Sequence, residues 1–212
     1  MPRARSKRSV VPVDAERTTR ERILGAAMHA FMERGFAETT MLEIATRARV
    51  SKRELYALVG NKEEMLAICV AERGKRMRLP QDFPSPTDLV SLRLALRQYG
   101  VTVLREVTDR RVLAVFRLGI AEAKRSPAIA RTIVEMGREP ARMALAGLLQ
   151  SAQESGLLPN RDSEKMVSRF RALLWGDQMV WILLGVANPP TPSEIARRAE
   201  EAAELFLELY GR

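Results

Sequence analysis

Four helix-start signals stand close together in the first third of the chain and constrain its fold more than any other feature. In each, a residue that can cap a helix is followed three positions later by glutamate: Thr18 and Glu21, Thr40 and Glu43, Ser51 and Glu54, Asn61 and Glu64. The capping side chain accepts a hydrogen bond from the backbone N–H three residues on, and the glutamate accepts one from the N–H of the capping residue. Four starts so close together predict four helices, two of them very short.

The spacing of these starts gives the expected helix boundaries. The first helix spans about 18–34 and ends at Gly35, because glycine readily adopts the left-handed conformation that closes a helix. The second spans about 40–48, and the third begins after Ser51. Two short helices joined by a tight turn and braced by a longer helix are typical of a helix-turn-helix DNA-binding unit.

The apolar residues of this stretch fit that interpretation. Leu42, Ala45 and Ala48 have helical spacing on one face of the second helix, so we expect them to be buried together. The small side chain of Ala45 allows the next helix to cross closely. Val50 and Leu55 can then pack back against the first helix.

This packing leaves Lys52, Arg53 and Tyr56 on the outer face of the third helix. Lysine and arginine can donate to the O6 and N7 atoms of guanine in the major groove, and a helix N-terminus favours phosphate. The alternative is a small helical subdomain whose cations are merely solvated. It leaves the agreement between caps, turn length and basic face unexplained.

The same stretch resembles the N-terminal DNA-binding domain of the TetR family of bacterial transcriptional regulators. The residues that carry the resemblance match in order and spacing: Ile23, Ala26, Ala27, Phe31, Gly35, Phe36, Thr39, Thr40, Ile44, Ala45, Ala48, Val50, Ser51, Leu55, Tyr56, Lys62, Glu63 and Leu66. The resemblance implies that Thr40 and Tyr56 contact phosphates of double-stranded DNA. It also implies that Lys52 and Arg53 meet bases or backbone, and that Lys62 binds a phosphate at the start of the fourth helix.

Two positions depart from the family pattern. Arg49 stands where the family usually has a turn glycine, and Val59 where it usually has phenylalanine. An arginine with positive φ is strained but possible, and here it would add a cation near the DNA. Together with Thr39 and Ser51, Arg49 completes the predicted DNA-binding set.

Composition and charge support an all-α DNA-binding protein. Of the 212 residues, 46% are hydrophobic and 29% charged, and no alternating strand pattern of useful length appears. The net charge of +9 is uneven, since residues 1–62 carry 13 Lys and Arg against 7 Asp and Glu, and the remainder 22 against 19. Most of the positive excess therefore lies on the predicted DNA-binding unit, as an electrostatic footprint should.

Histidine and cysteine are too few for the common catalytic and metal sites. The chain has one histidine, His29, and one cysteine, Cys69, so neither an internal disulfide, a zinc set nor a Cys/His pair can be built. Cys69 falls on the apolar face of the fourth helix and is expected to be a small buried side chain. We predict no enzymatic activity, cofactor or metal.

The chain divides into four expected segments. Residues 1–16 form a disordered basic arm that could lie along phosphates or in a minor groove, or equally be a solvated tail. Residues 17–61 form the helix-turn-helix domain, 62–79 a connecting helix able to transmit a shift, and 80–212 a ligand-binding and dimerisation domain. The chain lacks an apolar signal region and a run long enough to span a bilayer, so a cytoplasmic protein without a membrane partner is expected.

Caps, prolines and apolar periodicity predict the remaining helices. They begin near Ser85, Asp109, Ser126, Pro140, Asp162 and Thr191, for about nine or ten helices in all. The helix at about 163–185 is apolar around much of its circumference, which predicts burial on more than one side. With the last helix, at about 192–210, it would form a four-helix bundle with the same helices of a second copy, giving a homodimer. The alternative is a monomer that buries these faces internally.

Polar side chains scattered among large apolar ones in the C-terminal part suggest a pocket for a small-molecule effector. The candidate ligand-binding residues are Phe116, Arg117, Glu122, Trp175, Gln178 and Met179. Tryptophan and methionine at helical spacing also fill ordinary cores, and Arg117 and Glu122 can simply be solvated or paired. The stretches FRLGIAEAKRSPAIA and LLWGDQMVWILLG resemble the AefR-like regulatory domains of the TetR family, a resemblance that names no ligand.

The leading hypothesis is a homodimeric transcriptional regulator, more specifically a repressor, that binds a palindromic operator and is released by a small, mostly apolar molecule. The first alternative is an architectural DNA-binding protein with little sequence preference, for which the basic arm and net charge would serve equally well. The second is an all-α enzyme or carrier, which leaves the basic face of the third helix unexplained.

Overall fold

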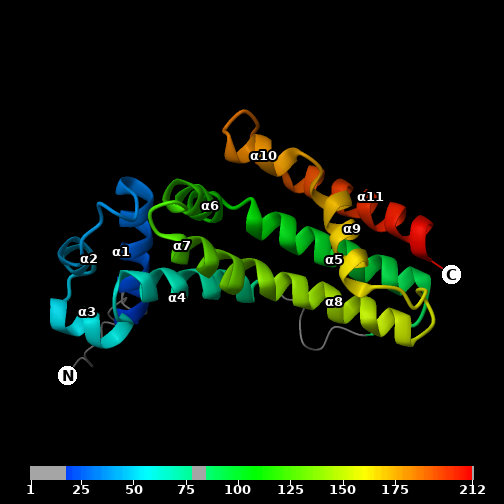
Figure 1. Ribbon diagram of the computed structural model, residues 1–212, viewed down its shortest axis with the longest axis horizontal. Helices are drawn as coiled ribbons and strands as arrows, with labels where there is room; N and C mark the ends of the chain where they lie inside the picture. The colour runs from blue at the N-terminus through cyan, green and yellow to red at the C-terminus, as the bar shows by residue number, and fades with distance from the viewer. Residues whose placement is uncertain (1–17, 78–84, 212) are drawn as a thin grey trace, which may run out of the picture.

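Every regular element in the part of the chain that the structure describes is a helix. The computed structural model describes residues 18–77 and 85–211, and contains no β-strand there (Figure 1). The predicted basic arm, 1–16, lies outside these residues, as does the end of the predicted connecting helix. In the same described ranges, no helix is both long and apolar enough to cross a membrane.

The four N-terminal helices begin where the capping signals predict. They are α1 (Thr19–Arg34), α2 (Met41–Ala48), α3 (Lys52–Val59) and α4 (Lys62–Lys75). Thr18 and Asn61 form complete capping boxes at α1 and α4, whereas Thr40 and Ser51 each accept a hydrogen bond from the backbone three residues on. Hydrogen bonds between residues three positions apart therefore determine where the helices of this part of the molecule begin.

The interior of this part is built from α1 outward. Ile23, Ala27 and Phe31 of α1 are buried against α2 and α3. The burial expected for Leu42 is wrong, because its side chain is 57% exposed. The buried side chains of α2 are instead Ile44, Ala45 and Ala48, with Met41 partly buried beside them, which is the spacing that places side chains on one helical face.

The C-terminal part is a bundle at the other end of the molecule. Its helices are α5 (Leu89–Val107), α6 (Arg110–Glu122), α7 (Pro127–Thr132), the π-helix η2 (Ile133–Arg138), α8 (Glu139–Glu154), α9 (Ser163–Trp175), α10 (Gln178–Leu183) and α11 (Pro192–Tyr210). Helix α11 packs along α5, and α9 packs between α11 and α8 (Figure 1). Tyr99, Phe170 and Phe206 form its aromatic centre, with successive ring centroids 6.0 and 5.4 Å apart.

Two predicted helices have different limits in the structure. The expected helix at 163–185 is divided into α9 and α10, because Gly176 has a φ of 48°, which closes a helix rather than continuing it. The expected interruption around Gly137 is instead the wider turn of η2, which joins α7 to α8 without a break.

The two parts are joined where α4 crosses η2. At Gly74 a Cβ atom would lie 2.1 Å from the carbonyl oxygen of Met136, and at Gly137 it would lie 3.2 Å from Val70. Only glycine at position 74 allows this approach. Val115 and Ile133 also belong to the same buried cluster as α1 to α4, so the N-terminal core extends into the C-terminal helices.

Candidate DNA-binding surface and internal cavities

The third helix, α3, has one buried side and one exposed side. Leu55 and Val59 are buried in the N-terminal core. Lys52 and Arg53 are exposed in its first turn, and the Tyr56 side chain is 52% exposed one turn later. The buried side of α3 anchors the helix, so its exposed side presents two cations and a phenol to solvent. The two cations lie at the N-terminal end of the helix, where the helix dipole also favours an anion.

The turn between α2 and α3 is closed by Arg49. This residue has φ 55° and ψ 49°, so the positive φ expected at this position is confirmed. Its backbone N–H donates to carbonyl oxygens at the end of α2, and its side chain is exposed. The left-handed conformation favours glycine, but here it places a guanidinium beside the start of α3.

Two N-caps add hydroxyl groups to the same surface. The Oγ1 of Thr40 accepts from the Glu43 N–H at 3.2 Å, and the Oγ of Ser51 accepts from the Glu54 N–H at 3.1 Å. Both residues are exposed. Each hydroxyl proton therefore remains available for an oxygen acceptor such as a phosphate.

Thr39 and Lys62 lie next to this surface but are engaged inside the protein. Thr39 is 1% exposed and donates to the carbonyl oxygen of Gly35 at 2.7 Å, which corrects the expectation that it contacts DNA. The Lys62 ammonium donates to the carbonyl oxygens of Phe36, Ala37 and Thr39 at 2.7, 3.3 and 2.9 Å. Since an ammonium has three N–H donors, Lys62 ties α4 to the α1–α2 connection in this structure, in place of the expected open phosphate contact.

An ion-pair network braces α1 against α2. Arg47 donates to Glu33 at 2.6 Å and to Glu43 at 2.7 Å, and its Nη1 lies 3.1 Å from Nδ1 of His29. The hydrogen bond from Arg47 lowers the pKa of Glu33 below its ordinary value. This arginine is therefore committed to the scaffold, whereas no salt bridge involves Lys52 or Arg53 in the described part of the chain.

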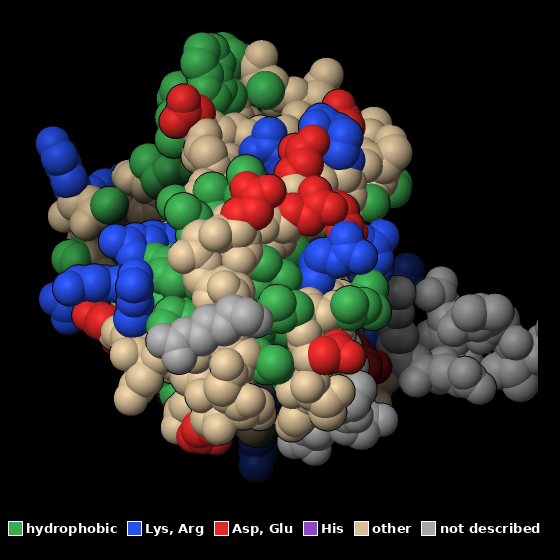
Figure 2. Space-filling model, turned by 90° about the vertical axis from the view of Figure 1, so that its right-hand side faces the viewer, with side chains coloured by type: hydrophobic (Ala, Val, Ile, Leu, Met, Phe, Trp, Pro, Cys, Tyr) green, Lys and Arg blue, Asp and Glu red, His purple; other side chains and the backbone are tan. Residues whose placement is uncertain are grey.

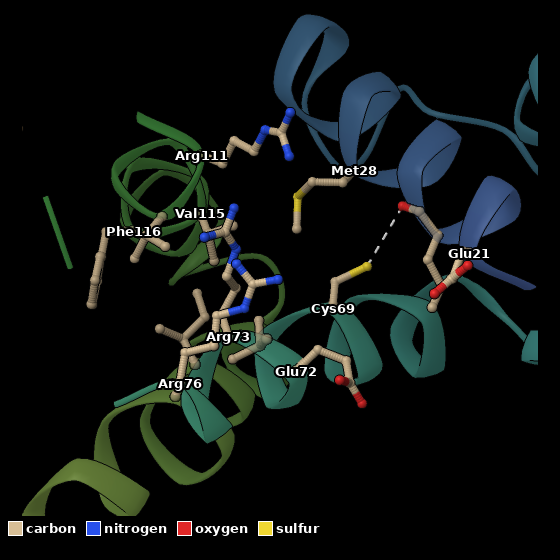
Figure 3. A pocket seen from close by; sticks show the side chains of 14 residues that line it. Glu21, Met28, Cys69, Glu72, Arg73, Arg76, Arg111, Val115 and Phe116 are labelled. Carbon is tan, nitrogen blue, oxygen red and sulfur yellow. Dashed lines mark hydrogen bonds between the residues drawn. The ribbon is translucent and has the colours of Figure 1, made fainter. Parts of the chain in front are cut away.

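A cavity of about 220 Å³, the junction cavity, lies where the two parts meet. It is bounded by Leu24 and Met28 of α1, Cys69 of α4, Val112 and Phe116 of α6, and Ile133 of η2. In Figure 3, Met28 projects between α4 and α6, and the Cys69 thiol is directed toward α1, where it bonds the carbonyl oxygen of Leu24 at 3.7 Å. Burial raises the pKa of Cys69 to about 11, so the thiol is neutral and poorly reactive.

A second cavity of about 230 Å³, the bundle cavity, lies among the C-terminal helices beside Met77 and is partly open to solvent. It is lined by residues that include Met77, Val103, Phe116, Arg138, Arg171 and Trp175. Of the predicted ligand-binding residues, Phe116, Trp175 and Met179 line it. Phe116 also lines the junction cavity and packs against both buried clusters, so the two cavities share this side chain.

The other three predicted ligand-binding residues lie elsewhere. Arg117 donates to the carbonyl oxygens of Leu183 and Ile182 at 3.0 and 2.8 Å, and so caps the end of α10. Glu122 is buried at the end of α6, and Gln178 has a buried amide oxygen without a partner in the described chain; neither lines the bundle cavity. Sequence reasoning missed Arg138 and Arg171, because an arginine facing a cavity has the same sequence signature as one facing solvent.

The described residues bring no three His, Cys, Asp or Glu side chains together in an arrangement suited to a metal ion. What they present is a cationic helix end on one part and two small cavities behind it.

Family models match both parts of the chain. A model described as bacterial regulatory proteins, tetR family, matches residues 23–68, and one described as an AefR-like transcriptional repressor, C-terminal domain, matches residues 94–212. Together the matches extend over the cationic helix end and most of the helices that enclose the bundle cavity.

Similar proteins include regulators with solved structures. A TetR transcriptional regulator from Agrobacterium tumefaciens is 27% identical, with 92% of this chain and 96% of that chain covered and a TM-score of 0.75. The flavonoid-responsive regulator FrrA is 29% identical, with coverage of 91% and 97% and a TM-score of 0.74. The uncharacterized HTH-type transcriptional regulator YdeS of Bacillus subtilis (strain 168) is 26% identical over 169 residues, 76% of this chain and 81% of that protein.

Proposed function

The chain belongs to the TetR family of bacterial transcriptional regulators, whose members are not enzymes, and we propose that it is a ligand-responsive repressor that binds a palindromic operator as a homodimer. The observation that carries the proposal is the first turn of α3. Lys52 and Arg53 extend from it into solvent, while Leu55 on the opposite side holds the helix to the core.

In the proposed complex, α3 enters a major groove. Lys52 and Arg53 donate to guanine edges or the DNA backbone, while Tyr56, Thr40 and Ser51 contact phosphates. Arg49 adds a further cation beside the groove. Contacts with phosphate fix the position of the helix, and contacts with bases supply the sequence preference.

The proposed dimer uses apolar side chains that a single copy leaves in solvent. On α10 and the turn after it, Val180, Trp181 and Leu184 are 59, 54 and 73% exposed, and on α11 Leu205 and Leu209 are 46 and 63% exposed. Figure 2 shows hydrophobic side chains gathered at the top of this end of the molecule, at the height of α10 in Figure 1. Exposed apolar patches of this kind are typical of interaction surfaces. A second copy of the chain would cover them and place two α3 helices about one DNA turn apart.

The proposed effector occupies the bundle cavity. FrrA, a relative of similar fold, is a flavonoid-responsive regulator, which supports a small-molecule response in this chain. Phe116 lies between this cavity and the N-terminal core, so a ligand that displaces its ring would also press on the packing of α1 and α4. To act as an inducer, the ligand must prefer the state that does not bind DNA; a tenfold preference corresponds to about 1.4 kcal/mol.

The test is a selection of the purified full-length protein against random duplex DNA at about 150 mM salt, where non-specific binding is weak. An enriched inverted repeat is the expected result. Binding without enrichment would replace the proposal with the architectural alternative, and an enriched single half-site would remove the dimer from it. The double variant Lys52→Ala/Arg53→Ala serves as the negative control, and it should enrich nothing.

A further inference from the structure

We propose that the effector of the bundle cavity carries a carboxylate, which Arg138 and Arg171 bind, on a small aromatic or aliphatic body held by the apolar walls. This inference deepens the proposed function and rests on it only where ligand binding is coupled to DNA. The binding step can be measured without DNA.

The described lining of the cavity is apolar except for two arginines. Arg138 comes from the end of η2 and Arg171 from the middle of α9, and both line the cavity. The remaining walls are aliphatic, aromatic or thioether side chains, including Val103, Phe116 and Trp175. No carboxylate is among the described residues that line it, so this part of the lining supplies two positive charges and no negative one.

The acidic side chain nearest in sequence to Arg138 is already engaged. Glu139 accepts from Nε of Arg142 at 2.8 Å, and Arg142 also pairs with Glu164. Within the described residues, neither Arg138 nor Arg171 takes part in a side-chain hydrogen bond or an ion pair. Arg171 is partly buried and Arg138 exposed, and the donors of both guanidiniums remain available to a ligand in the cavity that they line.

The electrostatics of Arg171 point the same way. Burial lowers the pKa of Arg171 below its ordinary value, and the positive charge of Arg138 lowers it further. A cation that is partly desolvated beside a like charge is unfavourable by itself. A bound anion would remove both costs, because charge-assisted hydrogen bonds between guanidinium and carboxylate are among the stronger ones in proteins.

The shape of the cavity limits the rest of the ligand. Its volume of about 230 Å³ is small, below the range of roughly 300–1,000 Å³ for drug-sized ligand pockets. Trp175 and Phe116 offer aromatic surface to a ring. A single ring or a short chain with a terminal carboxylate therefore fits this cavity better than a long or multiply charged molecule.

The test compares acids with amides of the same shape. The probes are benzoate, phenylacetate, 3-phenylpropanoate and 4-phenylbutanoate, each paired with its primary amide, titrated into the full-length protein by calorimetry. We expect at least one acid to bind about tenfold or more tightly than its amide, since hydrogen bonds between two charged groups are stronger than those to a neutral amide. The tightest acid is then added to the protein–operator complex, where it should lower operator affinity.

Variants separate the arginine pair from general effects of charge. Arg171→Gln should weaken binding of the acid by roughly 10- to 100-fold while changing binding of the amide by less than about threefold. Arg138→Gln should act in the same direction. The control is Arg105→Gln on α5, an exposed arginine outside the cavity lining, which removes the same charge and should change neither affinity.

Each outcome decides one of the two proposals. If no acid binds more tightly than its amide, or if Arg171→Gln weakens acid and amide equally, the carboxylate site is wrong while the regulator can still respond to a neutral ligand. If the acid binds through Arg171 but operator affinity does not change, the carboxylate site stands and the proposed inducer mechanism fails.

Discussion

The exposed end of α3 and the lining of the bundle cavity both present two cationic side chains, but the first pair lies on an open surface and the second beside an apolar cavity. Lys52 and Arg53 stand in water, where their long-range field is screened by salt and can be matched by any polyanion. Arg171 is partly buried and lines a cavity with apolar walls together with Arg138, whose side chain reaches solvent; partial desolvation of Arg171 makes its charge costly to leave unmatched, and the space admits only a small partner. Two cations beside a confined apolar space are thus suited to one small anion, whereas two cations on an open helix face are suited to DNA.

Removal of the exposed pair Lys52 and Arg53 should cause the greatest loss of operator affinity. Lys52→Ala/Arg53→Ala should reduce operator affinity by about a hundredfold or more, because each good contact to a base is worth about 1–3 kcal/mol. Binding of the best carboxylate probe in calorimetry should be unchanged, since the cavity is distant from α3. The control Arg105→Ala/Lys165→Ala removes the same charges from exposed positions on α5 and α9. An equal loss of affinity in that control would mean that α3 acts only through net charge.

The second prediction concerns the close contact between α4 and η2, which joins the two parts of the molecule. Gly74→Ala would place a Cβ 2.1 Å from the Met136 carbonyl oxygen, so α4 and η2 must separate. We expect the free energy of unfolding to fall by about 1–3 kcal/mol, the usual cost of overpacking, measured by urea denaturation. The matched change Gly25→Ala, where a Cβ meets nothing within 4 Å on helix α1, should instead stabilise by up to about 1 kcal/mol. A Gly74→Ala protein as stable as the original would show that the close crossing is not required.

A smaller effect concerns the communication between the regions. Phe116→Leu removes the ring shared by both cavities but keeps an apolar side chain, so both binding activities should persist. The ratio of operator affinities without and with the carboxylate probe gives the coupling free energy between the two sites. We expect this coupling free energy to fall by about 0.5–2 kcal/mol, the range seen for residues that modulate coupling. Fluorescence anisotropy of labelled operator measures the ratio. An unchanged ratio would exclude Phe116 from the transmission.

The last prediction concerns Arg49, whose replacement should cause only small changes in stability and in the salt dependence of DNA binding. Arg49→Gly relieves the left-handed conformation, and the stability change should lie within about 1 kcal/mol, because the unfolded chain also gains freedom. If the guanidinium contacts a phosphate, the slope of log affinity against log salt should fall by about 0.9 for the lost contact. A slope that does not change would mean that Arg49 only replaces a glycine in the turn.

The sequence predicted the parts of this molecule that short-range interactions determine. Each of the four N-terminal caps can be read from two residues, and Gly35 and Arg49 mark the helix ends where the structure has them. The prediction for Leu42 is wrong because a two-turn helix offers several apolar faces, and only the neighbouring helices decide which one is buried.

The candidate sites were predicted unevenly for the same reason. The exposed face of α3 follows from local periodicity, whereas the partners of Thr39, Lys62 and Arg117 are backbone carbonyls that periodicity does not reveal. The lining of the bundle cavity comes from helices far apart in the chain. Arg138 and Arg171 meet there only because of tertiary packing, which no spacing rule in the sequence encodes.

The π-helix η2 has a consequence for register. A π turn carries more residues than an α turn of similar height, so the six residues from Ile133 to Arg138 absorb a surplus between α7 and α8. Deleting one residue here would let an ordinary α-helix form and leave the facing sides of α7 and α8 nearly unchanged, because the wide turn had accommodated the surplus. The same deletion within α8, which has no surplus, would rotate every later side chain of that helix by about 100°. The wide turn thus makes this short segment the place where the long helix tolerates a change in length.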